Sequence, residues 1–509
     1  MTNSFASPTP LTVLHTSDWH LGRRLYGRMR YEEFEAFLAW LTETIVTHQV
    51  DVLIVAGDIF DTMTPSNKAQ ALYYEFLGKV SAIKVDGKPC CQHIVIVAGN
   101  HDSPTFLDAP SGVLKFLNVH VIGTACEDVA EEVLTLTNQD NEPLCIITAV
   151  PYLRDKDVRG SLAGESGQDK DANVIKGIRT HYDGVATVAK VKQDALIKTH
   201  GRPIPIIATG HLFAAGSKTT EDDGVRDLYV GSLGKVSADM FDECFDYVAL
   251  GHLHVPQRVG GSETIRYSGS PIPMGFGEAR QQKQVLLVRF GDVQFDEAQF
   301  GEGQSSFEDG SNNTNLAATS QSDSQPAIPA QSHFVDDLFG FETEESTATE
   351  EPATETISPL TPKVLHVDSD KNMQVVSLPI PCFQKLAQIS GDLDEIAAAI
   401  NALVSHKTAE SVWLEVIYTG DEIVSDLREH VQALSEGLPC EILKIKNTKT
   451  YDRVLNQEMA NETLQDLDEL EVFNRCLDIN NIAESQRDEL KRAYEQILYD
   501  IRHEDTRAE

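Results

Sequence analysis

Short apolar runs recur along the first part of the chain, and most of them end in a polar residue able to do chemistry. Seven of these runs are rich in Val and Ile and are bounded by Gly, Pro, Asn or Asp, as buried strands are: 11–18, 51–58, 93–102, 144–150, 205–211, 246–252 and 284–290. Between the first two runs, apolar residues stand at helical spacing over 32–48. This alternation predicts a layered α/β domain over residues 10–290.

A smaller unit follows in the second half of the chain. Its pattern predicts three strands and two amphipathic helices, in the order 372–380, 392–404, 411–419, 421–434 and 440–445. We therefore expect a small α+β domain over residues 366–447. Its first strand is able to pair with residues 284–290, which would place everything between them in a loop.

The last part of the chain, residues 448–509, is predicted to be helical. One helical face carries an apolar stripe, which consists of Leu490, Tyr494, Ile497, Leu498 and Ile501. Two interpretations remain open at this point. The stripe either forms internal core or docks a partner protein.

Negative charge is concentrated between the two units. Residues 290–362 contain 15 Asp and Glu and no Lys or Arg, and they are rich in Ser, Thr, Asn, Gln and Ala. Low hydrophobicity with charge of one sign cannot offset the entropy of ordering, which predicts a disordered acidic insertion over 291–365. One apolar island, FVDDLFGFE at 334–342, is either chance clustering in a linker or a short partner-docking motif.

Composition narrows the class of protein. The 509 residues carry a net charge of −37 and are 41% hydrophobic, so the chain can bury a sizeable core but cannot hold nucleic acid by bulk positive charge. No stretch approaches about 18 consecutive apolar residues, and residues 1–10 lack both a basic and an apolar segment, so we expect no membrane span and no secretion signal. The eight cysteines include no CxxC, which favours a reducing, cytoplasmic setting.

The strongest chemical signal is a set of possible metal ligands that follows five of the predicted strands. They stand in SDWH (17–20), GDIFD (57–61), GNHD (99–102), GH (210–211) and GHLH (251–254). The carboxyl ends of strands form the functional crevice in open α/β folds, so these segments are expected to converge. Imidazole, carboxylate and amide donors suit Mn²⁺, Fe²⁺ or Zn²⁺. Any one motif alone is as readily a turn or a buried structural histidine, but five together predict a metal centre.

The order of these motifs resembles the calcineurin-type metallophosphoesterases. A closer resemblance, to the SbcD family of bacterial DNA nuclease subunits, is carried by LHTSDWHLG, DVLIVAGDIFDTMTPS, VAGNHDSP, ATGHL, YVALGHLH and YSGSPIPMGF, and after the insertion by LPIPCFQKLAQISGDLDEI. Thr62 follows Asp61 where phosphatases of the superfamily usually have Arg, which favours a nuclease. The resemblance implies a calcineurin-like α/β domain, a DNA-capping domain over 366–447, and C-terminal helices that bind a partner ATPase.

The resemblance also implies a site for two divalent ions of the Mn²⁺ type. The implied ligands are Asp18, His20, Asp58 and His254 for one ion, and Asp58, Asn100, His211 and His252 for the other. Asp58 would bridge the two, as a site with ions about 3.5–4 Å apart requires. His101 is implied to act on the leaving oxygen, with Asp61 orienting its ring. Asp102 has either a turn-stabilising or a catalytic role.

A nuclease with so negative a net charge needs local basic groups to hold DNA. Three clusters qualify: Arg23, Arg24, Arg28 and Arg30; Arg154 and Arg159; and Lys444 and Lys446. Each cluster is also explained by a solvated loop, and the first is favoured because it begins three residues after His20. Phosphate contacts of this kind position DNA without reading its sequence.

The residues and the resemblance together predict the nuclease subunit of an SbcC–SbcD type complex. The expected activities are ATP-dependent 3′–5′ exonuclease on double-stranded ends and endonuclease on single strands and hairpins, in DNA repair, recombination and replication. The chain has no P-loop, so ATP dependence must come from a coiled-coil ATPase of the SbcC type, in an expected heterotetramer of two nuclease and two ATPase subunits. The alternatives are a phosphatase or cyclic-nucleotide phosphodiesterase with the same metal core, and a scaffold that binds DNA ends without cutting.

Overall fold

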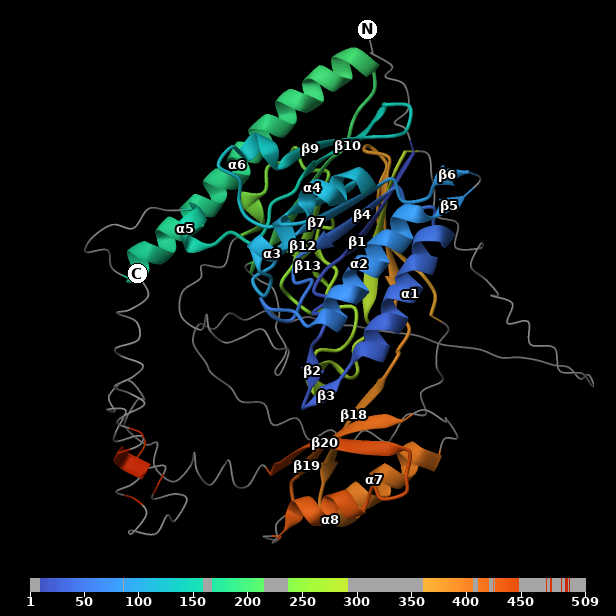
Figure 1. Cartoon of the computed structure of the whole chain (residues 1–509), viewed down its shortest axis with the longest axis vertical. Coiled ribbons are helices and arrows are strands. Elements are labelled where there is room, and N and C mark those ends of the chain that lie inside the picture. Colours follow the sequence, from blue (N-terminus) through green and yellow to red (C-terminus); the bar gives the residue numbers. More distant parts are fainter. Residues whose placement is uncertain are drawn as a thin grey trace, which may run out of the picture. The chain divides into compact units, whose positions relative to one another are not determined.

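Two β-sheets packed face to face build the region that carries the predicted motifs (Figure 1). The computed structural model describes residues 10–291 and 360–447, except 86, 159–166, 215–236, 406–410, 421–423 and 425. It also describes seven positions between 473 and 494. All seven strands predicted before the insertion are present, as β1 (Leu11–Thr16), β4 (Val52–Ala56), β7 (His93–Val97), β10 (Pro143–Thr148), β11 (Ile206–His211), β12 (Tyr247–Gly251) and β15 (Gln284–Phe290).

The first sheet has seven strands in the order β16-β17-β15-β1-β4-β7-β8, and β8 spans Val119–Ile122. β1, β4, β7 and β8 are parallel, and β15 runs antiparallel to β1. β15 also pairs with β17 (Met373–Pro379), which confirms the predicted pairing of 372–380 with 284–290. β16 (Lys363–Asp368), which the sequence did not reveal, pairs with β17. Both strands complete this sheet, and this placement corrects the expected start of the small domain at residue 366.

The second sheet has six strands in the order β13-β14-β12-β11-β10-β9, where β9 spans Val133–Thr137, β13 Gln257–Arg258 and β14 Ile265–Tyr267. β10, β11 and β12 are parallel, so their carboxyl ends share one edge, and His211 lies opposite Gly251. Between the sheets lies a core of buried apolar side chains that includes Val13, Ile54, Val95, Ile147, Ile207 and Ala249. Burial on both faces explains why these strands are continuous apolar runs.

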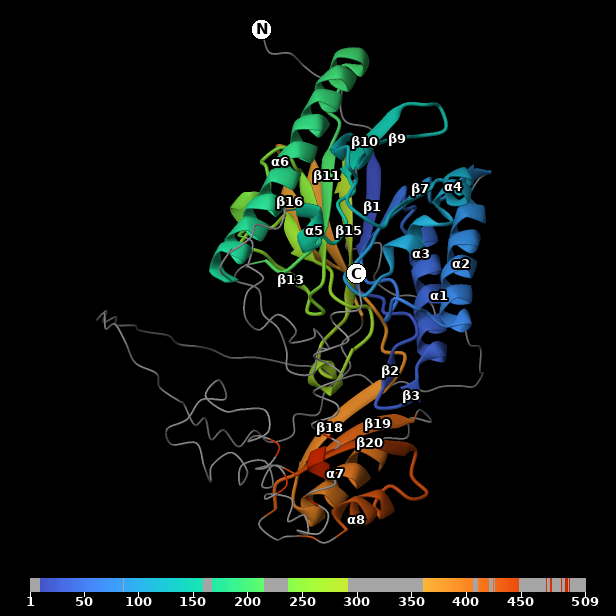
Figure 2. The same cartoon turned by 60° about the vertical axis from the view of Figure 1, so that its left-hand side comes forward.

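Helices cover the outer faces of both sheets, which confirms the predicted layered α/β class. Figure 2 shows α6 (Gly167–His200) on one side and α1 (Tyr31–Thr47) with α2 (Asn67–Ala82) on the other. α1 confirms the helix predicted over 32–48 and buries the face with Phe34, Phe37 and Leu41. The shorter elements are α3 (Pro104–Asp108), α4 (Ser111–Leu114), α5 (Asp155–Val158), β2 (Arg24–Leu25), β3 (Arg28–Met29), β5 (Lys84–Val85) and β6 (Lys88–Pro89).

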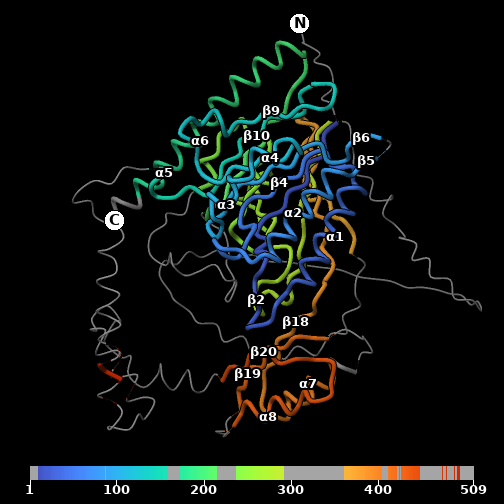
Figure 3. The backbone as a smooth tube through the Cα atoms, viewed as in Figure 1, coloured from blue at the N-terminus to red at the C-terminus, as the bar shows by residue number. Residues whose placement is uncertain are grey.

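The small domain is a three-stranded parallel sheet with two helices. Figure 3 follows the chain through β18 (Lys385–Gly391), α7 (Leu393–Ser405), β19 (Val412–Tyr418), α8 (Leu427–Ala433) and β20 (Cys440–Asn447). α7, β19 and β20 agree with the pattern, whereas α8 is shorter than the helix predicted over 421–434. Ile396, Ile400 and Val431 from the helices pack on Leu414 and Val416 of the central strand. Within the described part of the chain, no helix has the length and apolarity needed to cross a membrane.

Residues 292–359 of the acidic insertion, with the apolar island at 334–342, lie outside the described residues, as do most of residues 448–509. The end of the expected insertion, 363–365, is part of β16, so the disorder predicted for these three residues is wrong. The strands on either side of the insertion define what it must connect. β15 ends at Phe290, opposite Met373, while β16 begins at Lys363, opposite Ser377. The connection therefore has to run back along the length of β17 before β16 can begin.

Deleting residues 300–360 is expected to leave folding and metal-dependent cleavage intact. The deletion leaves about 11 connecting residues, which span up to ~36 Å when extended and so can still run back along β17. A shorter loop loses less entropy on closure, and the free energy of unfolding should rise by about 1–2 kcal/mol. Thermal melting and the nuclease rate test this expectation. A fall of many degrees in the melting temperature would show that the segment packs on the fold.

Candidate metal centre

Loops that follow β1 and β4 continue side by side beyond the ends of these strands. The Asp18 N–H donates to the carbonyl of Gly57 (3.0 Å), and the His20 N–H donates to the carbonyl of Asp58 (2.9 Å). Trp19, between the two ligands, is fully buried and packs edge-on against aromatic rings of α1 and α2. The apolar side chain in SDWH thus anchors the loop in the core and leaves the two flanking polar side chains facing the site.

Three of the predicted ligands form a first cluster. One ligand atom from each of Asp18, His20 and His254 lies within 4.8 Å of the others, and all three side chains are buried. His20 Nε2 lies 3.2 Å from His254 Nε2 and 3.5 Å from Asp58 Oδ2. Two imidazole nitrogens aimed at one point beside two carboxylates are the arrangement that a shared divalent cation explains.

The remaining ligands form a second cluster around Asn100. Its Oδ1 lies 3.0 Å from His211 Nε2 and 2.9 Å from His252 Nδ1. His211 Nε2 lies 3.3 Å from Asp58 Oδ2, the same oxygen that faces the first cluster. The structure therefore brings all seven predicted ligands together, with the Asp58 carboxylate between the two groups. This mixed nitrogen and oxygen donor set fits divalent ions of the Mn²⁺ type.

Backbone strain is concentrated at the candidate ligands. Asp18, His20, Asp58 and His252 have positive φ angles of 54°, 48°, 51° and 99°, a region that residues with a Cβ seldom occupy. Strain of this kind costs about 1–3 kcal/mol per residue and is typical of functional sites. At Gly99 an added Cβ would collide with the Asp58 carboxylate, so the GNHD motif needs glycine for close approach.

The buried charges of the site are balanced by their neighbours. Burial alone would raise the pKa of Asp58, but the charge and hydrogen bond of His211 and the charge of His20 hold that pKa well below its usual value. Burial lowers the pKa of His252 to about 3. The Asp58 carboxylate is therefore ionised and the His252 ring neutral at neutral pH, and these are the forms that bind metal ions. Against its burial, the charge of Asp58 raises the pKa of His211 to about 9, so this ring has to release its proton when an ion binds.

His101 lies beside the ligands, and Asp61 holds it through the main chain. His101 Nδ1 lies 3.0 Å from the Asp61 carbonyl oxygen, and the His101 N–H donates to Asp58 Oδ1 (2.9 Å). Because a carbonyl only accepts, Nδ1 carries the proton and Nε2 is the atom able to exchange one. The Asp61 carboxylate instead lies 3.5 Å from His20 Nδ1 and accepts a hydrogen bond from Arg23 (3.1 Å). The structure therefore orients His101 through the main-chain carbonyl of Asp61, an atom that the sequence prediction did not specify.

Of the two roles that the sequence left open for Asp102, the contacts in the structure support turn stabilisation. Its carboxylate is fully buried and accepts hydrogen bonds from the backbone N–H groups of Ile59, Phe60 and Gly99. Burial and the nearby charge of Asp58 raise the pKa of Asp102 to about 6, although the hydrogen bonds from the three N–H donors lower it. Asp102 thus ties the loop after β4 to the loop after β7.

Sequence reasoning missed the groups that hold Asp18. Ser17 Oγ donates to Asp18 Oδ2 (2.5 Å), and the His252 N–H donates to Asp18 Oδ1 (2.9 Å). Ser17 Oγ also lies 2.8 Å from the Oγ of Ser268, the residue that directly follows β14 of the second sheet. The Ser-Asp pair of SDWH was a visible signal for the first contact, whereas no local pattern indicates the other two.

Arg30, one of the residues assigned to DNA binding from the sequence, is buried and paired within the protein, which argues against that assignment. It is 1% exposed, and its guanidinium binds both carboxylate oxygens of Glu33 and donates to the carbonyl of Pro273. Arg23 pairs with Asp61 beside the site. Arg24 is exposed at the start of the β2–β3 hairpin.

Several other basic candidates lie where the β2–β3 hairpin meets the small domain. Arg28 pairs with Glu441 of β20, and Lys444 Nζ donates to the hydroxyl of Tyr26 (2.6 Å). Lys444 and Lys446 also pair with the buried carboxylate of Glu415. These cations therefore have acidic partners within the protein.

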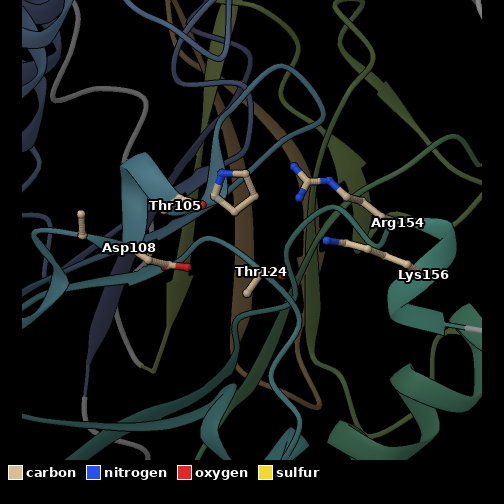
Figure 4. Close-up of a pocket in the computed structure, with 7 residues that line it drawn as sticks. Thr105, Asp108, Thr124, Arg154 and Lys156 are labelled. Atoms are coloured by element: carbon tan, nitrogen blue, oxygen red, sulfur yellow. The ribbon is translucent and has the colours of Figure 1, made fainter. Parts of the chain in front are cut away.

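The second basic cluster is only partly described, because Arg159 lies outside the described residues. Arg154 and Lys156 line an open hollow of about 500 Å³ together with Thr105, Asp108 and Thr124 (Figure 4). The segment that carries Arg154 also reaches the metal site. Two residues before Arg154, the Tyr152 ring stands edge-on to His211 with centroids 6.2 Å apart.

The chain is similar to known proteins over most of its length. Residues 11–256 match the family model described as calcineurin-like phosphoesterase, and residues 382–481 match SbcD_C, described as type 5 capsule protein repressor C-terminal domain. Over 493 residues the chain is 32% identical to the SbcD subunit of the SbcCD nuclease of Escherichia coli K12, an alignment that covers 96% of this chain and 98% of that protein. Two further SbcCD subunits of the same name each align with 55% of this chain and with 66% of their own length. The identity is 37% for the subunit of Rhodobacter capsulatus and 34% for that of Bacillus subtilis.

Proposed function

Because the chain belongs to the SbcD family of metal-dependent nuclease subunits, we propose that it acts on DNA in two ways. It digests double-stranded ends as an ATP-dependent 3′–5′ exonuclease, and it cuts single strands and hairpins as an endonuclease. The setting is cytoplasmic DNA repair, recombination and replication. The observation that carries the proposal is the position of the Asp58 carboxylate, whose Oδ2 faces the imidazoles of both ligand clusters.

The proposed ligand sets are Asp18, His20, Asp58 and His254 for one ion, and Asp58, Asn100, His211 and His252 for the other. Bound Mn²⁺ would lower the pKa of an attacking water and neutralise charge on the phosphate oxygens. His101, held by the Asp61 carbonyl, would deliver a proton from Nε2 to the leaving oxygen of the DNA strand. The Asp61 carboxylate, paired with Arg23, keeps the His20 ring oriented toward the site.

DNA contacts are proposed for the basic residues that remain accessible. Arg23 and Arg24 follow the first ligand motif, and Arg154 lines the hollow beside the loop after β10. Arg159, outside the described residues, remains a candidate. Arg28, Lys444 and Lys446 lie at the contact between the hairpin and the small domain, and they would have to exchange an acidic partner for phosphate. Such contacts make binding strongly dependent on salt.

The domain roles extend the same proposal. The small domain from β18 to β20 is the DNA-capping unit, and residues 448–509 bind a coiled-coil ATPase of the SbcC type. Two nuclease and two ATPase subunits would make up the complex. The C-terminal stripe is described at Leu490, which is 40% exposed, and at Tyr494, whose ring stacks on Phe473 with centroids 4.1 Å apart. Part of the stripe thus packs on the chain itself, and part remains accessible.

A nuclease assay of the purified chain, with and without its ATPase partner, tests the proposed function. We expect Mn²⁺-dependent nicking of single-stranded DNA by the chain alone, and digestion of linear duplex DNA only with the partner and ATP. A phosphatase would instead release phosphate from a phosphate monoester, and a phosphodiesterase of small substrates would open a cyclic nucleotide. Duplex binding without any cleavage in Mn²⁺ would favour the scaffold.

Replacing Leu490 with Asp is expected to uncouple the chain from its ATPase partner. A carboxylate placed in an apolar interface without a partner is costly, so binding in a pull-down should fall strongly. Single-strand cleavage by the isolated chain should stay within about twofold of wild type, because the metal site lies in another domain. The matched control is Arg492→Asp, a larger charge change at an exposed neighbour. Undiminished binding by a soluble Leu490 variant would assign the stripe to internal core.

A further inference from the structure

The segment YSGSPIPMGF at 267–276 and the residues after it have no role in the ligand sets, yet they wrap closely behind one ligand. The Ser270 N–H donates to the His254 carbonyl (3.1 Å), and Lys283 Nζ donates to the same oxygen (3.2 Å). Glu278 Oε1 lies 3.6 Å from His254 Nδ1. Both the backbone and the ring of His254 are therefore held from this segment.

Glu278 is itself held rigidly. It is fully buried, and its Oε2 accepts hydrogen bonds from Lys283 Nζ, from the Met274 N–H (3.0 Å) and from Ser270 Oγ (3.4 Å). Among the described residues, its other oxygen, Oε1, has no hydrogen-bond partner, and neither does His254 Nδ1. A buried carboxylate oxygen and a buried ring nitrogen thus face each other with no other group to satisfy them.

We propose that Glu278, fixed by Lys283, is a positioning residue for the ion held by Asp18, His20 and His254. A carboxylate behind Nδ1 keeps the proton on that nitrogen, so the lone pair of His254 stays on Nε2. That nitrogen faces His20 Nε2 at 3.2 Å, inside the first ligand cluster. Carboxylates in this position orient the ring and make the imidazole a stronger ligand. The inference rests on the proposed two-ion site, and it adds that Glu278 sets the affinity for one of the two ions.

The effect is expected to be confined to one ion. His211, in the other cluster, has its Nδ1 2.9 Å from the carbonyl of Ala56, which is a neutral acceptor. His252 uses Nδ1 toward Asn100. Neither ring contacts Glu278 in the hydrogen bonds of the described residues, so loss of the Glu278 charge should leave the second ion in place.

The test is a titration of metal-free protein with Mn²⁺ alone, followed by electron paramagnetic resonance of the free ion. Wild type should bind two ions. Glu278→Gln, which keeps the shape and removes the charge, should weaken one of them by about 10- to 100-fold and leave the other within about twofold. In cleavage assays the half-saturating Mn²⁺ concentration should rise by a similar factor, while the rate at saturating Mn²⁺ largely recovers.

The matched control is Glu33→Gln. Glu33 is also a buried carboxylate with a buried cation, and its partner Arg30 anchors the same segment at Pro273, but it contacts no ligand. This variant should lose stability on melting and still bind both ions with wild-type affinity. A merely structural role for Glu278 would make the two variants alike, and this result would overturn the proposal.

The remaining outcomes are also decisive. Two ions bound with wild-type affinity by Glu278→Gln would overturn the inference. Wild type that binds two ions and cuts no DNA would sink the proposed function and leave the role of Glu278 standing. If the single variant is insoluble because Lys283 is left unpaired, Glu278→Gln combined with Lys283→Gln removes that buried charge. The same loss of affinity at one ion is then expected, and two wild-type ions would again contradict the proposal.

Discussion

Replacing Asp58 with Asn is expected to remove both metal ions together and to abolish DNA cleavage. Asp58 Oδ2 lies 3.5 Å from His20 Nε2 and 3.3 Å from His211 Nε2, so one neutralised side chain weakens both clusters at once. Metal ions supply several kcal/mol of transition-state stabilisation, so the rate should fall by at least about 10³-fold. Mass spectrometry of bound metal and a Mn²⁺ nuclease assay measure the two effects.

The fold should survive this change, since an Asn carbonyl can still accept the His101 N–H that Asp58 Oδ1 accepts at 2.9 Å. Mn²⁺ should raise the melting temperature of wild type, because a ligand that binds only the folded state stabilises it, and should not raise that of the variant. Asp51→Asn is a suitable control. Asp51 is also a hydrogen-bonded carboxylate, but it lies at the opposite end of the strands and should keep both ions. One ion at full occupancy in Asp58→Asn would refute the bridging assignment.

Replacing His101 with Ala is expected to abolish cleavage while both ions stay bound. The ring is held through Nδ1 by the Asp61 carbonyl, and we assign Nε2 to proton transfer rather than to a metal. Proton transfer by a positioned side chain contributes about 10²- to 10⁴-fold, and the loss should lie in that range. Metal content distinguishes the roles, because ligand atoms of His101, His20 and Asp58 also lie within 4.8 Å of one another. Loss of an ion would place His101 among the ligands.

The leaving group offers a second test of His101. Nitrophenolate leaves a nitrophenyl phosphodiester as a stable anion that needs no proton, whereas the DNA strand leaves as an alkoxide that does. The variant should therefore lose much more activity on DNA than on the nitrophenyl ester. His101→Asn, which can still donate to the Asp61 carbonyl, is the matched variant and should behave like Ala. Equal losses on both substrates would indicate that His101 acts by electrostatic stabilisation or substrate binding.

The strands and the ligands were predictable because their signals are local. Each apolar run is short and continuous, and a polar residue at its end or just after it, such as His211 or Asp18, marks the carboxyl end of a strand. Parallel strands bring such ends to one edge of each sheet, which follows from the pattern. The packing of the two sheets then brings the two edges together. The helices α2 and α6 escaped prediction, as did the strands β16 and β18. β16 has six residues, as many as β1, but none of them is fully buried, so its apolar pattern is weak.

Contacts between segments far apart in the sequence could not be predicted from local patterns. Arg30 stands in an arginine-rich stretch that reads as a DNA-binding loop, yet Glu33 and Pro273 bury it. Asp61 is the last residue of the second motif and was expected to orient His101, but only the folded loop shows that its carbonyl makes this contact. Glu278 lies 24 residues beyond His254 with no pattern linking them, and only the fold places it behind the ring.

The sequence by itself determined the class of fold, the identity of the seven candidate ligands and the family. These properties depend on periodicity, on residue type and on order along the chain, and all three can be read locally. The tertiary structure alone decided which charged side chains are buried, which atom of Asp61 meets His101, and that β16 is added at the edge of the first sheet. The physical reason is that the state of a buried charge or an added strand depends on partners far away along the chain, and no local pattern records them.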